Sequence, residues 1–214
     1  MPETFPSEET EMTAQAGEVQ ALSDTLFYWT VYEPSLKCDI GCTALKVGPG
    51  LIVIDPVPLA DAVWQELLAM APLCAILLTN GNHVRATAGL RQRYRVPVVT
   101  APETRREIAG IKPDVVLLEN ELLYGVSPIA IPGATAGETA FYASAGVMII
   151  GDAVINVSPE RGLELLPDKY CADAGQNRES LRKLLDYDFH TLTFAHGFPV
   201  TSHAKEKLQT LLKS

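Results

Sequence analysis

Two hydrophobic periodicities alternate along the first half of the chain. Short extended apolar runs predict strands at 25–32, 42–47, 51–54, 74–78 and 96–99. Apolar residues at helical spacing predict helices at 58–70 and 86–94. The Gly48-Pro49-Gly50 turn is expected to join the strands on either side of it as a hairpin. This alternation favours helices packed on a sheet.

The second half repeats the rhythm with more strands. A helix is predicted at 102–109, and strands are predicted at 115–118, 121–123, 127–131, 139–143, 147–150 and 191–194. Amphipathic patterns predict helices at 178–185, with Asn177 as the cap, and at 201–212. The pattern by itself predicts one domain of the α/β or α+β class.

Composition separates a short N-terminal segment from the rest. Residues 1–18 contain several Glu, Thr, Pro and Ala and few large apolar side chains, which predicts a flexible acidic arm before a single domain at 19–214. The N-terminus has no apolar run of the kind found in a secretory signal, and no stretch reaches the roughly 18 apolar residues of a membrane span. We therefore expect a cytoplasmic protein.

Charge and cysteine content narrow the classes of partner. The net charge is −9, which argues against nucleic acid and anionic membranes as partners, since both attract clustered Lys and Arg. The four cysteines are expected to be reduced structural thiols, and a Cys38–Cys42 disulfide is the alternative. A small-molecule ligand and a homo-oligomer both remain open.

The most informative segment follows the predicted strand at 74–78. Its apolar run ends in Thr79-Asn80-Gly81-Asn82-His83-Val84-Arg85, a polar loop at the carboxyl end of a strand, where ligands bind in layered α/β folds. The segment resembles the signature loop of the metallo-β-lactamase superfamily, an apolar strand followed by Thr-His-x-His-x-Asp-His. Laid on that motif, the four ligand positions hold Asn80, Asn82, Val84 and Arg85. A neutral amide is a poor zinc ligand, valine has no lone pair and arginine adds a positive charge.

Five more segments resemble the superfamily in the expected order. They are an early strand ending in Asp (51–56), the entry to the next strand (94–99), a Pro-Gly-His-Thr-x-Gly-His-like segment (131–140), a Gly-Asp-Ala strand end (149–153) and a Gly-His-Gly-like segment (194–199). The resemblance covers nearly the whole chain after residue 25. It implies a four-layer αββα sandwich, that is, an α/β (α+β) fold.

The same resemblance implies a degenerate metal site. Ala134 occupies the position of the family's third histidine, whereas the bridging aspartate is kept as Asp152 and the last histidine as His196. Two of seven ligand positions survive, and a catalytic zinc normally needs three protein ligands and an open position. His83 lies one residue off the ligand register, so we expect a loop histidine hydrogen-bonded to its neighbours.

Three hypotheses for the function follow. The favoured one is a pseudoenzyme or binding module without a metal or other cofactor, whose pocket for a small polar or anionic ligand contains Asn80, Asn82, His83, Arg85 and Ala134 beside Asp152 and His196. The alternative is a hydrolase of the ester or thioester type, similar to glyoxalase II. In it Asp152 would orient His196 as the catalytic base, or one weakly bound divalent metal would sit on Asp152, His196 and His83. The third is a structural partner in an oligomer.

Overall fold

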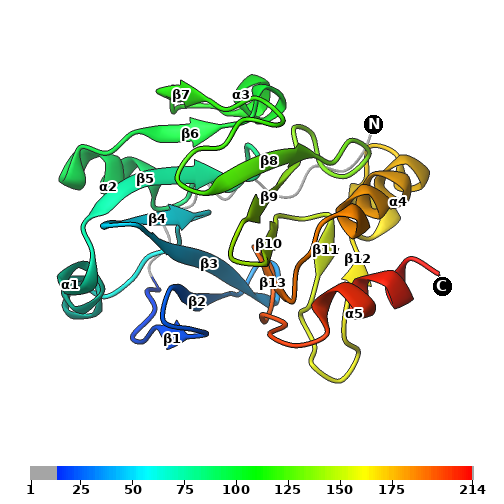
Figure 1. The fold of residues 1–214 in the computed structure, drawn as a ribbon, viewed down its shortest axis with the longest axis horizontal. Helices are drawn as coiled ribbons and strands as arrows, with labels where there is room; N and C mark the ends of the chain where they lie inside the picture. The colour runs from blue at the N-terminus through cyan, green and yellow to red at the C-terminus, as the bar shows by residue number, and fades with distance from the viewer. Residues whose placement is uncertain (1–13, 214) are drawn as a thin grey trace.

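The computed structural model describes residues 14–213, which form two β-sheets lying face to face (Figure 1). The larger sheet has seven strands in the order β1 (Gln20–Ala21), β2 (Leu26–Glu33), β3 (Cys38–Val47), β4 (Gly50–Ile54), β5 (Leu73–Leu78), β6 (Val98–Thr100) and β7 (Val115–Val116). The smaller has the order β13 (Thr191–Phe194), β10 (Val147–Ile150), β9 (Thr139–Ala143) and β8 (Val126–Ala130). A separate ladder pairs β11 (Val154–Ile155) with β12 (Glu164–Leu165).

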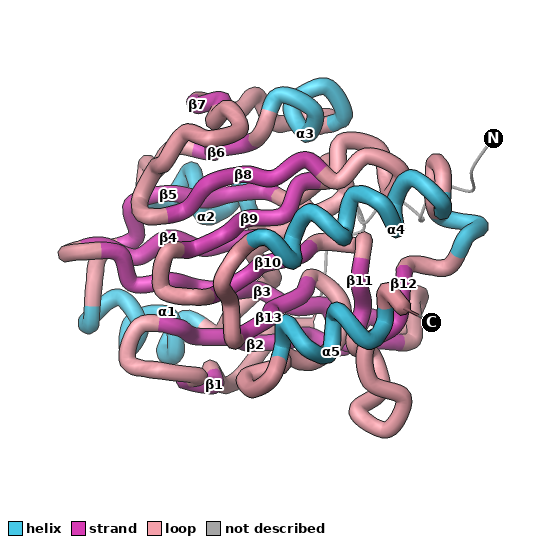
Figure 2. The backbone as a smooth tube through the Cα atoms, turned by 45° about the vertical axis from the view of Figure 1, so that its right-hand side comes forward, coloured by secondary structure: helices cyan, strands magenta, loops and turns pink. Residues whose placement is uncertain are grey.

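Helices cover the outer face of each sheet (Figure 2). Helices α1 (Asp61–Met70) and α2 (Thr87–Tyr94) pack on the larger sheet, and α4 (Ala174–Arg182) and α5 (Ala204–Leu211) pack on the smaller one. The short helix α3 (Pro102–Glu107) follows β6, and two 3₁₀ turns lie at Asp168–Tyr170 and Lys183–Asp186. The order helix, sheet, sheet, helix is the predicted four-layer sandwich, so the fold prediction is confirmed.

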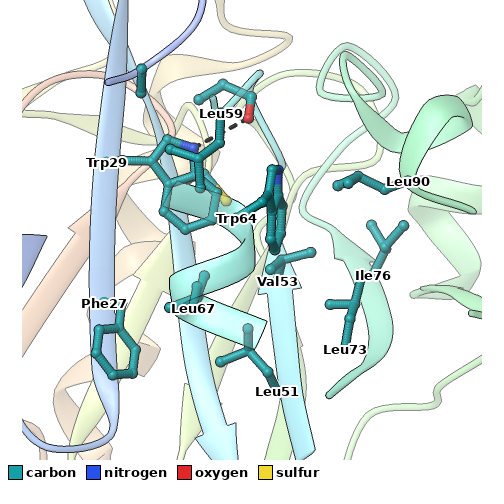
Figure 3. Close-up of a cluster of buried hydrophobic side chains, with 14 of the residues drawn as sticks. Phe27, Trp29, Leu51, Val53, Leu59, Trp64, Leu67, Leu73, Ile76 and Leu90 are labelled. Atoms are coloured by element: carbon teal, nitrogen blue, oxygen red, sulfur yellow. Dashed lines mark hydrogen bonds between the residues drawn. The ribbon is translucent and has the colours of Figure 1, made fainter. Parts of the chain in front are cut away.

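Three apolar clusters bind these layers together. The central one lies between the sheets and includes Ile52 and Leu77 from one and Phe141 and Ile149 from the other, all buried. Figure 3 shows the cluster beneath α1, where the Trp29 and Trp64 rings pack edge to face. Their ring centroids are 5.7 Å apart. Such an aromatic pair contributes about 0.5–1.5 kcal/mol beyond its burial. The Trp29 indole N–H also donates to the Val57 carbonyl at 3.2 Å, which satisfies its polar atom.

Several predicted element boundaries were wrong. The predicted strand at 121–123 is a loop in which only Leu123 bridges to Val126. The first helix begins at Asp61 instead of residue 58, because Leu59 forms a bridge with Ala16. Helix α4 begins earlier than predicted, and its cap is Asp173, whose carboxylate accepts from the Gln176 N–H at 2.9 Å.

The N-terminal arm is only partly within the described residues. Its residues 1–13 lie outside them, and Ala16 is buried, with its N–H donating to the Pro58 carbonyl at 2.9 Å. All four cysteines are thiols, so the alternative of a Cys38–Cys42 disulfide was wrong. Between residues 14 and 213, no helix has both the length and the apolar character needed to cross a membrane.

Candidate functional site

The topology brings four strand ends to one edge of the two sheets. Strands β4 and β5 run parallel in the larger sheet, and β10 and β13 run parallel in the smaller one. Asp55 follows β4, His83 lies in the loop after β5, Asp152 follows β10 and His196 follows β13. Loops at the carboxyl ends of parallel strands are the usual place for ligand sites.

Asp55 fixes the start of the loop after β5. It has a left-handed backbone (φ 52°) that turns its carboxylate toward Thr79. One carboxylate oxygen accepts from the Thr79 N–H at 2.9 Å, and the other accepts from the Thr79 hydroxyl at 2.5 Å. These bonds hold the end of β5 against the end of β4.

His83 lies in the centre of the site, with 1% of its surface exposed. Its Nδ1 is 3.1 Å from Asp55 Oδ2 and 2.8 Å from Thr79 Oγ1, and its Nε2 is 3.1 Å from Asp152 Oδ1. Because each ring nitrogen faces a carboxylate oxygen, the geometry favours a proton on both nitrogens. Burial and Arg85 oppose the charge, but Asp152 and Asp55 outweigh them and raise the pKa of His83 to about 10.

Asp152 is the residue on which the network converges. Its Oδ1 accepts from His83 Nε2 at 3.1 Å and from His196 Nε2 at 2.9 Å. Its Oδ2 accepts from Asn80 Nδ2 at 2.9 Å. The Thr135 hydroxyl lies 3.1 Å from this oxygen and 3.0 Å from Glu138 Oε2, so the two carboxylates share its one proton. Burial alone would raise the pKa of Asp152, but the charge of His83 and the hydrogen bonds from His196 and His83 hold it well below the usual range.

His196 connects the network to the surface. A backbone bridge to Ile40 and a 2.8 Å bond from the Gly197 N–H to the Asp39 carbonyl fix its loop against β3. Gly197 has φ 95°, and a Cβ there would lie 2.1 Å from the Asn156 carbonyl oxygen, so the turn requires glycine. The Nδ1 atom of His196 lies 3.8 Å from the Cys38 sulfur.

Glu138 belongs to the site but was missed by the sequence analysis. It is 2% exposed, and its Oε1 accepts from the backbone N–H of Asp152 at 2.8 Å. Its Oε2 accepts from Asn80 Nδ2 at 2.7 Å. Burial and the charge of Asp152 raise the pKa of Glu138 to about 8. The available signal was its place at the end of segment 131–138, where the superfamily motif has its last histidine.

The remaining predicted pocket residues occupy different places. Asn80 is fully buried, where its amide bridges Asp152 and Glu138. Asn82 and Arg85 are half-buried in the same loop. Ala134 is fully buried among the apolar residues of the smaller sheet, and its place beside a ligand stays a prediction.

An open pocket of about 350 Å³ lies beside His196. Its described lining includes Cys38, Lys37, Arg161, Ser35 and Tyr170 together with His196. The lining therefore has two cations, and none of its described residues is acidic. This pocket was not predicted, because its walls come from segments more than 100 residues apart in the sequence.

His83, Asp152 and His196 could together hold one metal ion. Their ligand atoms lie within 4.8 Å of one another, and two imidazoles with one carboxylate are a suitable donor set for a single zinc ion with an open position. The five other ligand positions of the superfamily motifs hold residues that cannot replace the lost ligands, so the residues do not fit a two-metal centre. For a single ion, His83 would first have to lose a ring proton that it shares with Asp152.

The two-sheet sandwich with polar residues at its strand ends defines an αββα class of proteins, and comparison with known proteins identifies the family. A family model described as "Metallo-beta-lactamase superfamily" matches residues 20–214, and the chain belongs to this superfamily. A comparison with curated proteins gave no match.

Solved structures share the fold at low sequence identity. A metallo-beta-lactamase from Pontibacter korlensis superposes with a TM-score of 0.72 at 18% identity, covering 94% of this chain and all (100%) of that one. The metallo-beta-lactamase FIM-1 from Pseudomonas aeruginosa, in its mono-zinc form, superposes with a TM-score of 0.71 at 14% identity. The match covers 94% of this chain and 96% of that one. These likenesses establish the fold alone, since one fold hosts many functions.

Proposed function

We propose that this protein is a metal-independent member of the superfamily that binds a small anionic ligand in the pocket beside His196. The observation that carries the proposal is that protein hydrogen-bond donors surround both carboxylate oxygens of Asp152. A carboxylate has about four lone-pair positions. In Asp152 three of these accept from His83, His196 and Asn80. The fourth faces the Thr135 hydroxyl, whose one proton Asp152 shares with Glu138, so a cation would have to displace a protein donor.

His83 supplies the charge that a metal would supply. As an imidazolium between Asp55 and Asp152, it neutralises the buried carboxylates with distances of 3.1 Å on each side. Asn80 supports it by donating to Asp152 and Glu138. A protein cation and an amide thus stand at the strand ends where the superfamily motifs carry metal ligands.

The chemistry of the pocket favours an anionic ligand. Lys37 and Arg161 line it, and Tyr170 adds a hydroxyl group. Arg161 also pairs with Glu164 at 3.2 Å, and the Ser35 hydroxyl donates to Glu33 at 2.6 Å. Because guanidinium and ammonium groups form strong charge-assisted bonds with carboxylates and phosphates, this lining suits a small anion. A volume of about 350 Å³ is at the lower end of the range for small-molecule sites.

We predict that Arg161→Gln weakens anion binding by up to about fivefold, because Arg161 is exposed and pairs with Glu164, and an exposed charge pair contributes about 0.2–1 kcal/mol. Binding of inorganic phosphate and of succinate would be measured by isothermal titration calorimetry at low salt. Arg105→Gln, which removes an exposed charge on α3, is the matched control and should bind as the parent does. Equal affinity in both variants, or no binding by the parent protein, would contradict the proposal.

A second candidate is hydrolysis of an ester or thioester with one divalent metal on His83, Asp152 and His196. The convergence of their ligand atoms within 4.8 Å favours it. Metal binding requires the imidazoles of His83 and His196 to be neutral ligands. The metal content of the purified protein therefore distinguishes this candidate from the first proposal.

A further inference from the structure

We propose that Cys38, His196 and Asp152 form a nucleophilic triad that hydrolyses an activated acyl group bound in this pocket. The inference rests on the proposed function for the pocket in which the acyl donor binds. His196 lies between the other two residues, with Nδ1 at 3.8 Å from the Cys38 sulfur and Nε2 at 2.9 Å from Asp152 Oδ1. A nucleophile, a base and a group that orients the base, in that order, are the arrangement that activates a weak nucleophile.

Backbone hydrogen bonds hold the Cys38 thiol close to the His196 imidazole. Cys38 begins β3, and Ile40, two residues on, bridges to His196. The Gly41 N–H donates to the Ala195 carbonyl at 2.8 Å. The Tyr28 hydroxyl lies 2.8 and 2.7 Å from the carbonyl oxygens of Phe194 and Gly197, which share its one proton. Both groups therefore sit on rigid elements, as preorganised chemistry requires.

The hydrogen bond to Asp152 sets the tautomer of His196. Because the carboxylate accepts a proton from Nε2, the lone pair of the neutral ring is on Nδ1, which faces the sulfur. His196 can then accept the thiol proton, and Asp152 stabilises the imidazolium that forms.

The other three cysteines lack this environment. Cys42 is buried, and burial raises the pKa of its thiol. The thiol of Cys74 donates to the Leu51 carbonyl at 3.1 Å, and that of Cys171 donates to the Leu166 carbonyl at 3.6 Å. Within residues 14–213, Cys38 is the cysteine whose sulfur contacts a histidine and also lines an open pocket.

The reaction needs only water as co-reactant. The Cys38 sulfur attacks the acyl carbon as its proton passes to His196 Nδ1, and a carbon–sulfur bond forms. His196 returns that proton to the departing alcohol or thiol, which leaves an acyl-Cys38 thioester. Water then attacks the thioester with His196 as base, and the proton returns to the Cys38 sulfur as the acid is released. Lys37 and Arg161 line the same pocket and add positive charge to it, although Arg161 also pairs with Glu164 at 3.2 Å.

The first test is alkylation of the full-length protein by iodoacetamide, with the modified residues mapped by mass spectrometry. We expect Cys38 to react at least about tenfold faster than Cys74, since the thiolate is the reacting species. His196→Gln should remove this difference, whereas Cys74→Ser should leave the rate at Cys38 unchanged. A Cys38 that reacts no faster than Cys74, or that ignores His196→Gln, overturns the proposal.

The second test uses p-nitrophenyl acetate as the acyl donor. We expect an acetyl adduct on Cys38 and turnover that falls at least about 100-fold in Cys38→Ala, in keeping with the size of nucleophilic and base catalysis. Turnover retained in Cys38→Ala overturns the triad. If phosphate and succinate still bind while Cys38 is inert, only the triad fails; if neither binds, the proposed anion pocket fails separately.

Discussion

Asp152→Ala is expected to lower the free energy of unfolding by about 3–5 kcal/mol, the usual result of breaking a buried ion pair. The substitution would leave His83 charged beside one carboxylate instead of two. It would also remove the acceptor of Asn80, Thr135 and His196, all held in a site where Asp152 has no exposed surface. Urea denaturation followed by circular dichroism at pH 7 would give the difference.

Asp188→Ala is the matched control for this prediction, because Asp188 is exposed and its change should stay within about 0.5 kcal/mol. A loss at Asp152 no larger than the loss at Asp188 would mean that the buried network contributes nothing to stability. His83 would then not stabilise the fold by neutralising the buried carboxylates of Asp55 and Asp152.

The stability of the protein is expected to fall as the pH rises from about 6.5 to about 10. The pKa of His83 is raised from 6.5 to about 10 in the folded state, so its contribution is complete below 6.5 and is lost as the pH rises through 10. Glu138 acts in the same direction, because its pKa is raised from 4.5 to about 8 and the folded state favours the protonated form. The combined loss should be of the order of a few kcal/mol.

Urea unfolding at several pH values would measure this slope in the parent protein, His83→Gln and the control His203→Gln. His203 is exposed, so the control should keep the slope of the parent, while His83→Gln should flatten it above pH 8. A stability that is constant between pH 6.5 and 10, or a slope above pH 8 that persists in His83→Gln, would show that His83 does not carry the charge.

The sequence predicted the fold well because the long strands carry strong patterns. Strands β2, β4, β5, β9, β10 and β13 fall within or close to the predicted ranges, whereas β3 begins at Cys38, four residues before the predicted start at residue 42. The ladder of β11 and β12 was missed because each strand has only two residues, too few for a period to be visible. The start of α1 was misplaced because a contact with Ala16, distant in the sequence, holds residues 58–60 outside the helix.

The site was less predictable because its decisive contacts are long-range. Asp152 and His196 were found through the resemblance, but the centring of His83 between Asp55 and Asp152 depends on residues 28 and 69 positions away. Cys38 was expected to be structural, since nothing near it in the sequence indicates a histidine 158 positions later. Glu138 was missed because a glutamate before a strand is ordinarily exposed.

The central claim is that His83 and the donors around Asp152 take the place of a metal ion. The most direct test is elemental analysis by inductively coupled plasma mass spectrometry on untagged protein, with and without added Zn²⁺, Fe²⁺ and Mn²⁺. We predict less than about a tenth of an equivalent of each metal, because any ion must displace a proton or a donor from Asp152. About one equivalent, lost in both His83→Gln and Asp152→Ala, would contradict the account and assign these residues to a single-metal site.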